Sequence, residues 1–195
     1  MTFGIPLDWL AVAAGLAMMG AGVAYQLHKS RKLEGYAKSH GYALANSWAG
    51  TSITGACNGR PFTVLLRSGK NGRTAVSATA AQRAFILDIS LETVLSAAGK
   101  LVGMQDIRTG DEAFDKAFAV ASSDAQLALR VLDPDTRRML LGLKAGFSGI
   151  IDSMPSVSVG PGMVSVEILR AVQDPEKLDA LISCATTLAM KVDAA

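Results

Sequence analysis

The residue types that carry out covalent catalysis are scarce in this chain, which has two histidines and two cysteines among its 195 residues. Serine and cysteine nucleophiles are usually activated by a nearby histidine. His28 and His40 both lie in a basic stretch that precedes the globular part of the chain. Cys57 and Cys184 stand in apolar segments, as buried free thiols do in a reducing compartment. The sequence therefore predicts neither a Ser-His-Asp nor a Cys-His centre.

Paired carboxylates are the second arrangement that could do chemistry. Asp111 with Asp115, and Asp133 with Asp135, are spaced closely enough to hold a divalent cation. Each pair also stands at the expected start of a helix, where carboxylates are stabilised by free backbone amides. Because helix capping explains both pairs, no metal site is predicted.

The glycine-rich segments do not form a phosphate-binding loop. The chain contains neither G-x-x-x-x-G-K-[ST] nor G-x-G-x-x-G. The Gly-Phe-Ser-Gly stretch at 146–149 lacks the spacing of a nucleophile elbow. We expect no cofactor and no enzymatic activity, and catalysis of an unfamiliar type by carboxylates or lysine is the least favoured alternative.

One short segment combines glycine, acids and aromatics in a pattern that predicts a structural role. Phe114 and Phe118 are four residues apart, so on one helical turn they would share a face. Asp111 can cap that turn and Gly110 can allow its entry. Asp115 would then point away from the aromatic face, toward backbone amides or an arginine.

This segment, TGDEAFDKAF, resembles the T-G-[DN]-x-x-F-D-x-x-F pattern of a bacterial family of membrane-anchored proteins of unknown function. The resemblance covers roughly residues 100–192 and the anchor that precedes them. It implies a membrane-tethered α+β domain. It implies no activity, because the family is uncharacterised.

The element that must hold this domain is an apolar stretch near the N-terminus. Residues 9–27 carry no charge, and Trp9 and Tyr25 stand near the two ends, where aromatic rings favour the membrane interface. About 20 apolar residues span a hydrocarbon core. We therefore predict a transmembrane helix over 7–27, preceded by a short external N-terminus, 1–6. A cleaved signal peptide is less favoured, because its positive charge should precede the apolar run.

Charge sets the predicted orientation. Residues 1–27 carry a formal charge of −1, and residues 28–40 carry +3. Because positive flanks stay in the cytoplasm, we expect a bacterial inner-membrane protein with its N-terminus outside and its main domain cytoplasmic. A basic juxtamembrane helix is expected over 28–41, with Gly41 as its stop. Four cations on it are predicted to contact anionic lipid headgroups: Lys29, Arg31, Lys32 and Lys38.

The predicted span is rich in alanine and glycine rather than leucine. Small residues at four-residue spacing let helices approach closely in lipid, so they favour contact with a membrane protein partner. A generally alanine-rich composition is the alternative explanation. The residues expected at such a contact are Ala13, Gly15, Ala17, Gly20, Ala21 and Ala24.

The amino-acid composition argues against several classes of protein. Half of the residues are hydrophobic and the mean hydropathy is +0.30, which excludes a disordered chain. Two cysteines exclude a disulfide scaffold. A net charge of +2, concentrated beside the predicted span, argues against nucleic acid as a partner.

The rest of the chain, 42–195, reads as a cytoplasmic α+β domain with an antiparallel sheet and packing helices. Asn-Gly at 58–59 predicts a hairpin within a meander of four or five strands over 42–90. Asp124, Asp133 and Asp174 predict helix starts, and Pro161-Gly162 predicts a hairpin turn. Either one domain or two related sheet units, 42–103 and 104–195, fits this pattern.

Two functions remain in view. The first is a non-catalytic, single-span accessory or scaffold subunit of a bacterial inner-membrane complex, with respiratory and photosynthetic assemblies among the options. It follows from the small-residue span, the neutral domain and the lack of a catalytic constellation. The alternative is a membrane-tethered binding module that recruits a soluble cytoplasmic partner or ligand.

Overall fold

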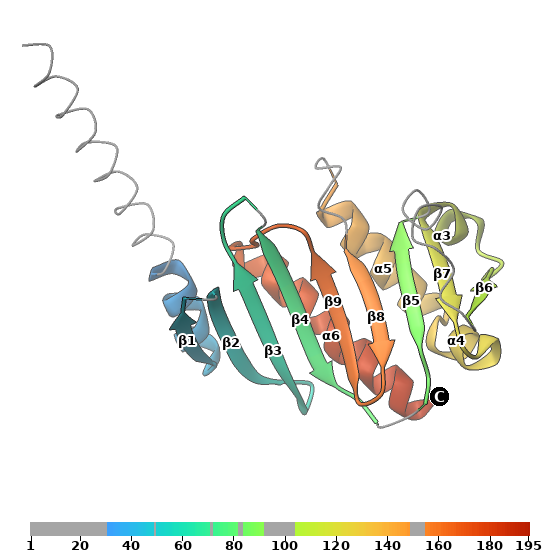
Figure 1. Cartoon of the computed structure of the whole chain (residues 1–195), viewed down its shortest axis with the longest axis horizontal. Helices are drawn as coiled ribbons and strands as arrows, with labels where there is room; N and C mark the ends of the chain where they lie inside the picture. The colour runs from blue at the N-terminus through green and yellow to red at the C-terminus, as the bar shows by residue number, and fades with distance from the viewer. Residues whose placement is uncertain (1–30, 49, 71, 82–83, 92–103, 149–154) are drawn as a thin grey trace, which may run out of the picture.

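The computed structural model describes residues 31–48, 50–70, 72–81, 84–91, 104–148 and 155–195 (Figure 1). The predicted span at 7–27, its small-residue contact face and Lys29 lie outside these residues. Among the described residues, no helix is both long and apolar enough to cross a membrane. The basic helix is present, running through 31–40 with Gly41 at φ +69°. The amide of Tyr42 donates to the carbonyl of Ala37 at 2.8 Å, which closes the helix with a Schellman-type bond.

The predicted α+β class with an antiparallel sheet is confirmed. In the part of the chain that the structure describes, nine strands form one sheet in the order β1-β2-β3-β4-β9-β8-β5-β7-β6, and every neighbouring pair is antiparallel. The strands are β1 Ala43–Ser47, β2 Gly50–Cys57, β3 Arg60–Arg67, β4 Arg73–Thr79, β5 Leu87–Leu91, β6 Gln105–Ile107, β7 Phe118–Ser122, β8 Ser156–Gly160 and β9 Met163–Ile168.

The first four strands form the predicted meander, but the fifth does not continue it. Asn58 and Gly59 both have positive φ, as a two-residue hairpin turn between β2 and β3 requires. Two strands separate β5 from β4, because the β8–β9 hairpin occupies the space between them. The segments 42–103 and 104–195 therefore contribute strands to one sheet. The turn of that hairpin is Pro161-Gly162, as predicted, with Gly162 at φ +77°.

Four labelled helices follow the predicted starts. They are α3 Glu112–Ala117, α4 Ala125–Val131, α5 Pro134–Gly146 and α6 Pro175–Ala194. The side chains of Asp111, Asp124, Asp133 and Asp174 each accept a hydrogen bond from an amide in the first turn of these helices. Pro134 and Pro175 occupy the first helical position, where no amide bond is lost.

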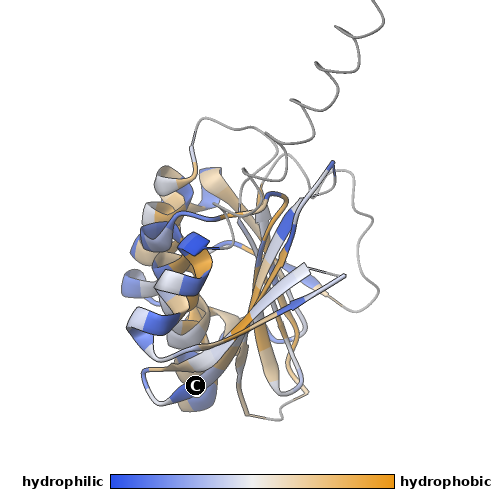
Figure 2. Cartoon of the chain, turned by 90° about the vertical axis from the view of Figure 1, so that its left-hand side faces the viewer, coloured by the Kyte–Doolittle hydropathy of each residue, from blue (hydrophilic) through white to orange (hydrophobic). Residues whose placement is uncertain are grey.

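The helices lie on one face of the sheet, and the core is between the two layers (Figure 2). The apolar face of α6 is buried, including Leu178, Leu181 and Leu188 at 0% exposure. It packs against β3, β4 and β9. Val64, Val76 and other alternate strand residues meet it from the sheet.

The opposite face of the sheet carries small hydroxyl side chains in register. Pairing across the strands aligns one transverse row: Thr54, Thr63, Ser77, Ser165, Ser158 and Asp88. Burial raises the pKa of the Asp88 carboxyl above its ordinary value.

The basic helix does not extend freely from the domain. Leu33, Tyr36 and Ala37 are buried against it, while Arg31, Lys32 and Lys38 face solvent. The Tyr36 hydroxyl donates to Oδ1 of Asp179 on α6 at 2.5 Å. The helix is therefore one face of the folded domain rather than a separate stalk.

Candidate functional site

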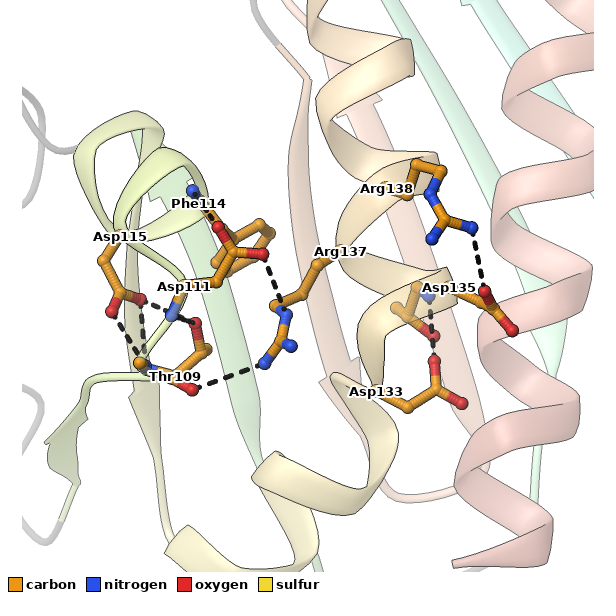
Figure 3. Close-up of polar contacts among 10 residues, drawn as sticks. Thr109, Asp111, Phe114, Asp115, Asp133, Asp135, Arg137 and Arg138 are labelled. Carbon is orange, nitrogen blue, oxygen red and sulfur yellow. Dashed lines mark hydrogen bonds and ion pairs between the residues drawn. The ribbon is translucent and has the colours of Figure 1, made fainter.

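The T-G-D-x-x-F-D segment forms a tight corner between β6 and β7, here called the motif corner (residues 108–118). Gly110 takes φ +79°, which allows the chain to reverse before α3. Oδ1 of Asp111 then accepts from the amide of Phe114 at 3.2 Å. The predicted entry and cap are both confirmed (Figure 3).

Asp115 holds the corner closed from the other side. Its carboxylate accepts from the amide of Thr109 at 3.0 Å, from the Thr109 hydroxyl at 2.8 Å and from the amide of Gly110 at 3.0 Å. Burial alone would raise the pKa of this carboxyl, but these hydrogen bonds outweigh it and lower the pKa below the ordinary value. Asp115 therefore binds backbone amides, as the sequence predicted.

Arg137 joins the motif corner to α5. Its Nε lies 3.4 Å from Oδ2 of Asp111 without hydrogen-bond geometry, and its Nη1 donates to the carbonyl of Thr109 at 3.3 Å (Figure 3). Its side chain is 17% exposed. Arg138, the next residue, is by contrast 79% exposed. Since Thr136 and Leu140 on the same helix are buried, the Arg137 side chain begins near the core boundary.

The two aromatic rings of the motif meet, although not on one helical turn. Phe118 is the first residue of β7, because α3 ends at Ala117. The rings of Phe114 and Phe118 nevertheless lie 5.0 Å apart, and both are buried. Lys144 on α5 lies 5.7 Å from the centroid of the Phe118 ring. The pair anchors the corner in the core.

The polar side chains of the motif corner are occupied by structural contacts. Its acids, its threonine and its arginine are all engaged with one another or with backbone groups. Within the described part of the chain, no group of three or more histidine, cysteine, aspartate or glutamate side chains could hold a metal ion. The arrangement stabilises a chain reversal, which fits the structural role predicted for the motif.

The second carboxylate pair divides between two different partners. Asp133 accepts from Lys191 on α6. Asp135 pairs with Arg138 at 3.0 Å in an exposed contact (Figure 3). The hydrogen bond from Lys191, joined by one from the amide of Thr136, lowers the pKa of Asp133 to about 2. These contacts join α5 to α6.

Among the described residues, neither cysteine is hydrogen-bonded to a histidine. Both thiols are free; Cys184 is buried, which raises its pKa to about 12, and Cys57 is half-buried. His40 ends the basic helix, as predicted, with Nδ1 3.0 Å from the carbonyl of Tyr36. His28 lies outside the described residues.

An aromatic cluster at the basic helix was missed by the sequence reasoning. The His40 ring stacks on Tyr42 at 5.3 Å, and Tyr42 meets Phe62 of β3 edge to face at 4.9 Å. Burial and the hydrogen bond to Asp179 raise the pKa of Tyr36 above its ordinary value. The available signal was the spacing of Leu33, Tyr36 and Ala37, which is that of one buried helical face.

Two hollows open on the surface beside α6. One of about 520 Å³ lies between the β3–β4 connection, the β9–α6 connection and Phe147, and includes Lys70, Arg170 and Lys177. The other, about 410 Å³, is an apolar groove between α5 and α6. Its lining includes Met139, Gly142, Leu143, Ala180 and Cys184.

No family model matches the chain, and the comparison with curated protein sequences likewise gives no match. The fold is similar to that in the crystal structure of the mycobacterial trehalose monomycolate transport factor A, TtfA. The two share a TM-score of 0.60 at 11% sequence identity, over 84% of this chain and 94% of that one. This similarity shows a shared fold.

Proposed function

We propose that the chain is a non-catalytic, single-span accessory subunit of a bacterial inner-membrane protein complex. Its span is 7–27, its N-terminus is outside and its main domain is cytoplasmic. The similarity to TtfA carries the proposal, because that fold belongs to a protein named as a transport factor and extends over nearly all of both chains. The complex that this similarity favours is a transport assembly.

The chemistry of the described residues supports a role without catalysis. The acids of the motif corner stabilise backbone amides, and the second pair of acids joins two helices. Neither Cys57 nor Cys184 is hydrogen-bonded to His40 within the described ranges of the chain. The partner contact is assigned to the small-residue face of the span, where close helix packing needs no large apolar side chain.

Extraction from native membranes in a mild detergent tests this proposal. We expect the chain to migrate with a stoichiometric membrane complex on native sizing, with mass spectrometry naming the other subunits. Replacing Ala13, Ala17 and Ala21 together with Leu should release the chain from that complex. A wild-type chain that migrates alone would contradict the proposal.

A second triple variant controls for the number of leucines introduced into the span. If the span is helical, Val12, Met19 and Val23 lie on the face away from the alanine stripe. Replacing these three with Leu should leave the complex intact. Equal release by both triple variants would show that the stripe is not the contact.

The apolar groove between α5 and α6 favours the second candidate, a binding module that recruits a cytoplasmic partner or ligand. A Cβ at Gly142 meets no atom within 4 Å, so Gly142→Leu fills the groove without distorting α5. If the groove recruits a partner, this variant loses it and keeps the membrane complex. If the Gly142→Leu variant retains every co-purifying protein, this groove does not recruit a partner.

A further inference from the structure

Antiparallel topology gathers several loops at one end of the sheet, here called the entry edge. Because β1 to β4 alternate in direction, the β1–β2 turn and the β3–β4 turn lie at the same end. β9 pairs antiparallel with β4, so its last residues reach that end too. The entry edge comprises Trp48, Ser68–Lys70, Gly72 and Leu169–Arg170. The β3–β4 turn, which belongs to it, lies at the top of the sheet in Figure 1.

The two most exposed large apolar side chains among the described residues are both on the entry edge. Trp48 is 101% exposed at the β1–β2 turn, and Leu169 is 65% exposed just after β9. A fully solvated tryptophan leaves a large apolar ring in water. Its amphipathic ring is stabilised at a membrane interface, where one side is apolar and the other wet.

Uncompensated positive charge surrounds these two side chains. Arg67 and Arg73 face each other across the ends of β3 and β4, and like charges in that position repel. Arg73 is paired with Glu167. No described carboxylate forms an ion pair with the side chain of Arg67, Lys70 or Arg170.

The opposite end of the sheet differs in both respects. Arg60, at the start of β3, is paired with Asp193 of α6. Met163, at the β8–β9 turn, is the most exposed large apolar side chain there, at 50%. The combination of exposed apolar anchors and unpaired cations is thus a property of the entry edge.

The chain itself enters the domain from the same side. The first described residue, Arg31, lies at the end of the basic helix that points toward the entry edge (Figure 1). Residues 28–30 alone separate the predicted span from that helix, a reach of roughly 10 Å when extended. This distance is close to the screening length of about 8 Å at physiological ionic strength.

The basic helix also fixes how the domain faces the membrane. It is held to α6 by the Tyr36–Asp179 hydrogen bond and to β3 through the Tyr42–Phe62 ring contact. With the proposed span in the membrane, a domain held to this helix keeps its entry edge within reach of the lipid surface.

We propose that the entry edge docks on an anionic lipid surface, with Trp48 and Leu169 in the interface and Lys70 and Arg170 on headgroup phosphates. This inference rests on the proposed span. It adds a folded lipid-contact surface, formed by residues between 48 and 170, to the cations next to the span. The hollow beside Lys70, Arg170 and Lys177 can receive a headgroup.

Trp48 reports on this contact directly. The chain has two tryptophans, so Trp9→Phe leaves Trp48 as the single fluorophore. The full-length variant is reconstituted into phosphatidylcholine vesicles with or without phosphatidylglycerol, with bromine placed near the headgroup end of the acyl chains. We expect bromine to quench Trp48 strongly in the anionic vesicles, and less in neutral vesicles or at high salt.

Paired substitutions identify the residues that make the contact. Lys70→Ser with Arg170→Ser should shift the equilibrium about 30-fold toward the released domain, from about fivefold for each basic residue. Arg130→Ser with Arg138→Ser, two exposed cations on α4 and α5 outside the entry edge, should leave quenching unchanged. Leu169→Ser should reduce quenching, and the matched change at the exposed Leu129 should not.

A carbonate wash separates failure of this inference from failure of the span. Quenching that is absent in anionic vesicles, in protein that resists the wash, overturns the docking surface and leaves the proposed function standing. If Trp48 becomes shielded from solvent only after a protein partner is added, that result also overturns the docking surface and leaves the proposed function standing. Protein stripped by the wash overturns the span, while quenching recorded before the wash still decides whether the entry edge meets lipid.

Discussion

At the residue scale, Asp115 is the side chain on which the motif corner depends. Asp115→Asn would place an amide group against donors that now meet a carboxylate, so at least one of these donors loses its charged acceptor. We expect a loss of about 1–3 kcal/mol in the free energy of unfolding. Urea titration of the full chain in detergent measures it. Asp135→Asn, at an exposed pair, is the control and should cost less than about 1 kcal/mol; equal costs would contradict the role given to Asp115.

Asp133 gives a prediction about pH. Its pKa in the folded chain is about 2, against an ordinary value of 3.8. A depressed pKa means that its contribution to stability is complete above about pH 4 and is lost as the pH falls through about 2. Asn also caps helices, so Asp133→Asn removes the charge and keeps the cap.

The stability difference between wild type and Asp133→Asn should be below about 1 kcal/mol at pH 7, because both partners are partly solvated. It should shrink to nothing between pH 4 and pH 2. Unfolding midpoints measured across that interval test the assignment. A difference that stays constant down to pH 2 would show that Lys191 does not bind the carboxylate.

At the scale of elements, the docked basic helix depends on Tyr36. Tyr36→Phe keeps the ring and loses the hydrogen bond to Asp179, at a cost of about 1 kcal/mol. Tyr36→Ala also removes the buried ring, at about 3–5 kcal/mol. Hydrogen exchange of the amides in 31–40 should accelerate slightly in the first variant and strongly in the second. Unchanged exchange in Tyr36→Ala would mean that the helix is held by other contacts.

Element boundaries were predictable wherever the signal was local. The Asn58-Gly59 turn, the Asp-Pro starts of α5 and α6 and the buried face of α6 each follow from residues a few positions apart. The motif cap at Asp111 is local in the same sense. By contrast, the placement of β8–β9 between β4 and β5 depends on pairing between distant strands. Arg137 and Thr109 are 28 residues apart in the sequence, and no spacing pattern predicts their contact.

At the scale of the whole molecule, the inserted hairpin makes the sheet indivisible. β4 reaches β5 only through β9 and β8, so neither half of the chain has a complete sheet of its own. We predict one cooperative unfolding transition. Trp48 fluorescence and far-ultraviolet circular dichroism should give the same urea midpoint in the Trp9→Phe protein. Two separated midpoints would show that the halves unfold independently.

The same hairpin has a consequence for synthesis of the protein. β4 is complete at Thr79, but its partner in the sheet begins at Met163. Translation at roughly 5–20 residues per second leaves an interval of roughly 4 to 17 seconds between the two. Through that interval β4 is an open sheet edge in a nascent chain whose predicted span is already available to the insertion machinery. An exposed edge of this kind invites pairing with other chains, so the ribosome-bound intermediate is the stage at which this protein most needs a chaperone.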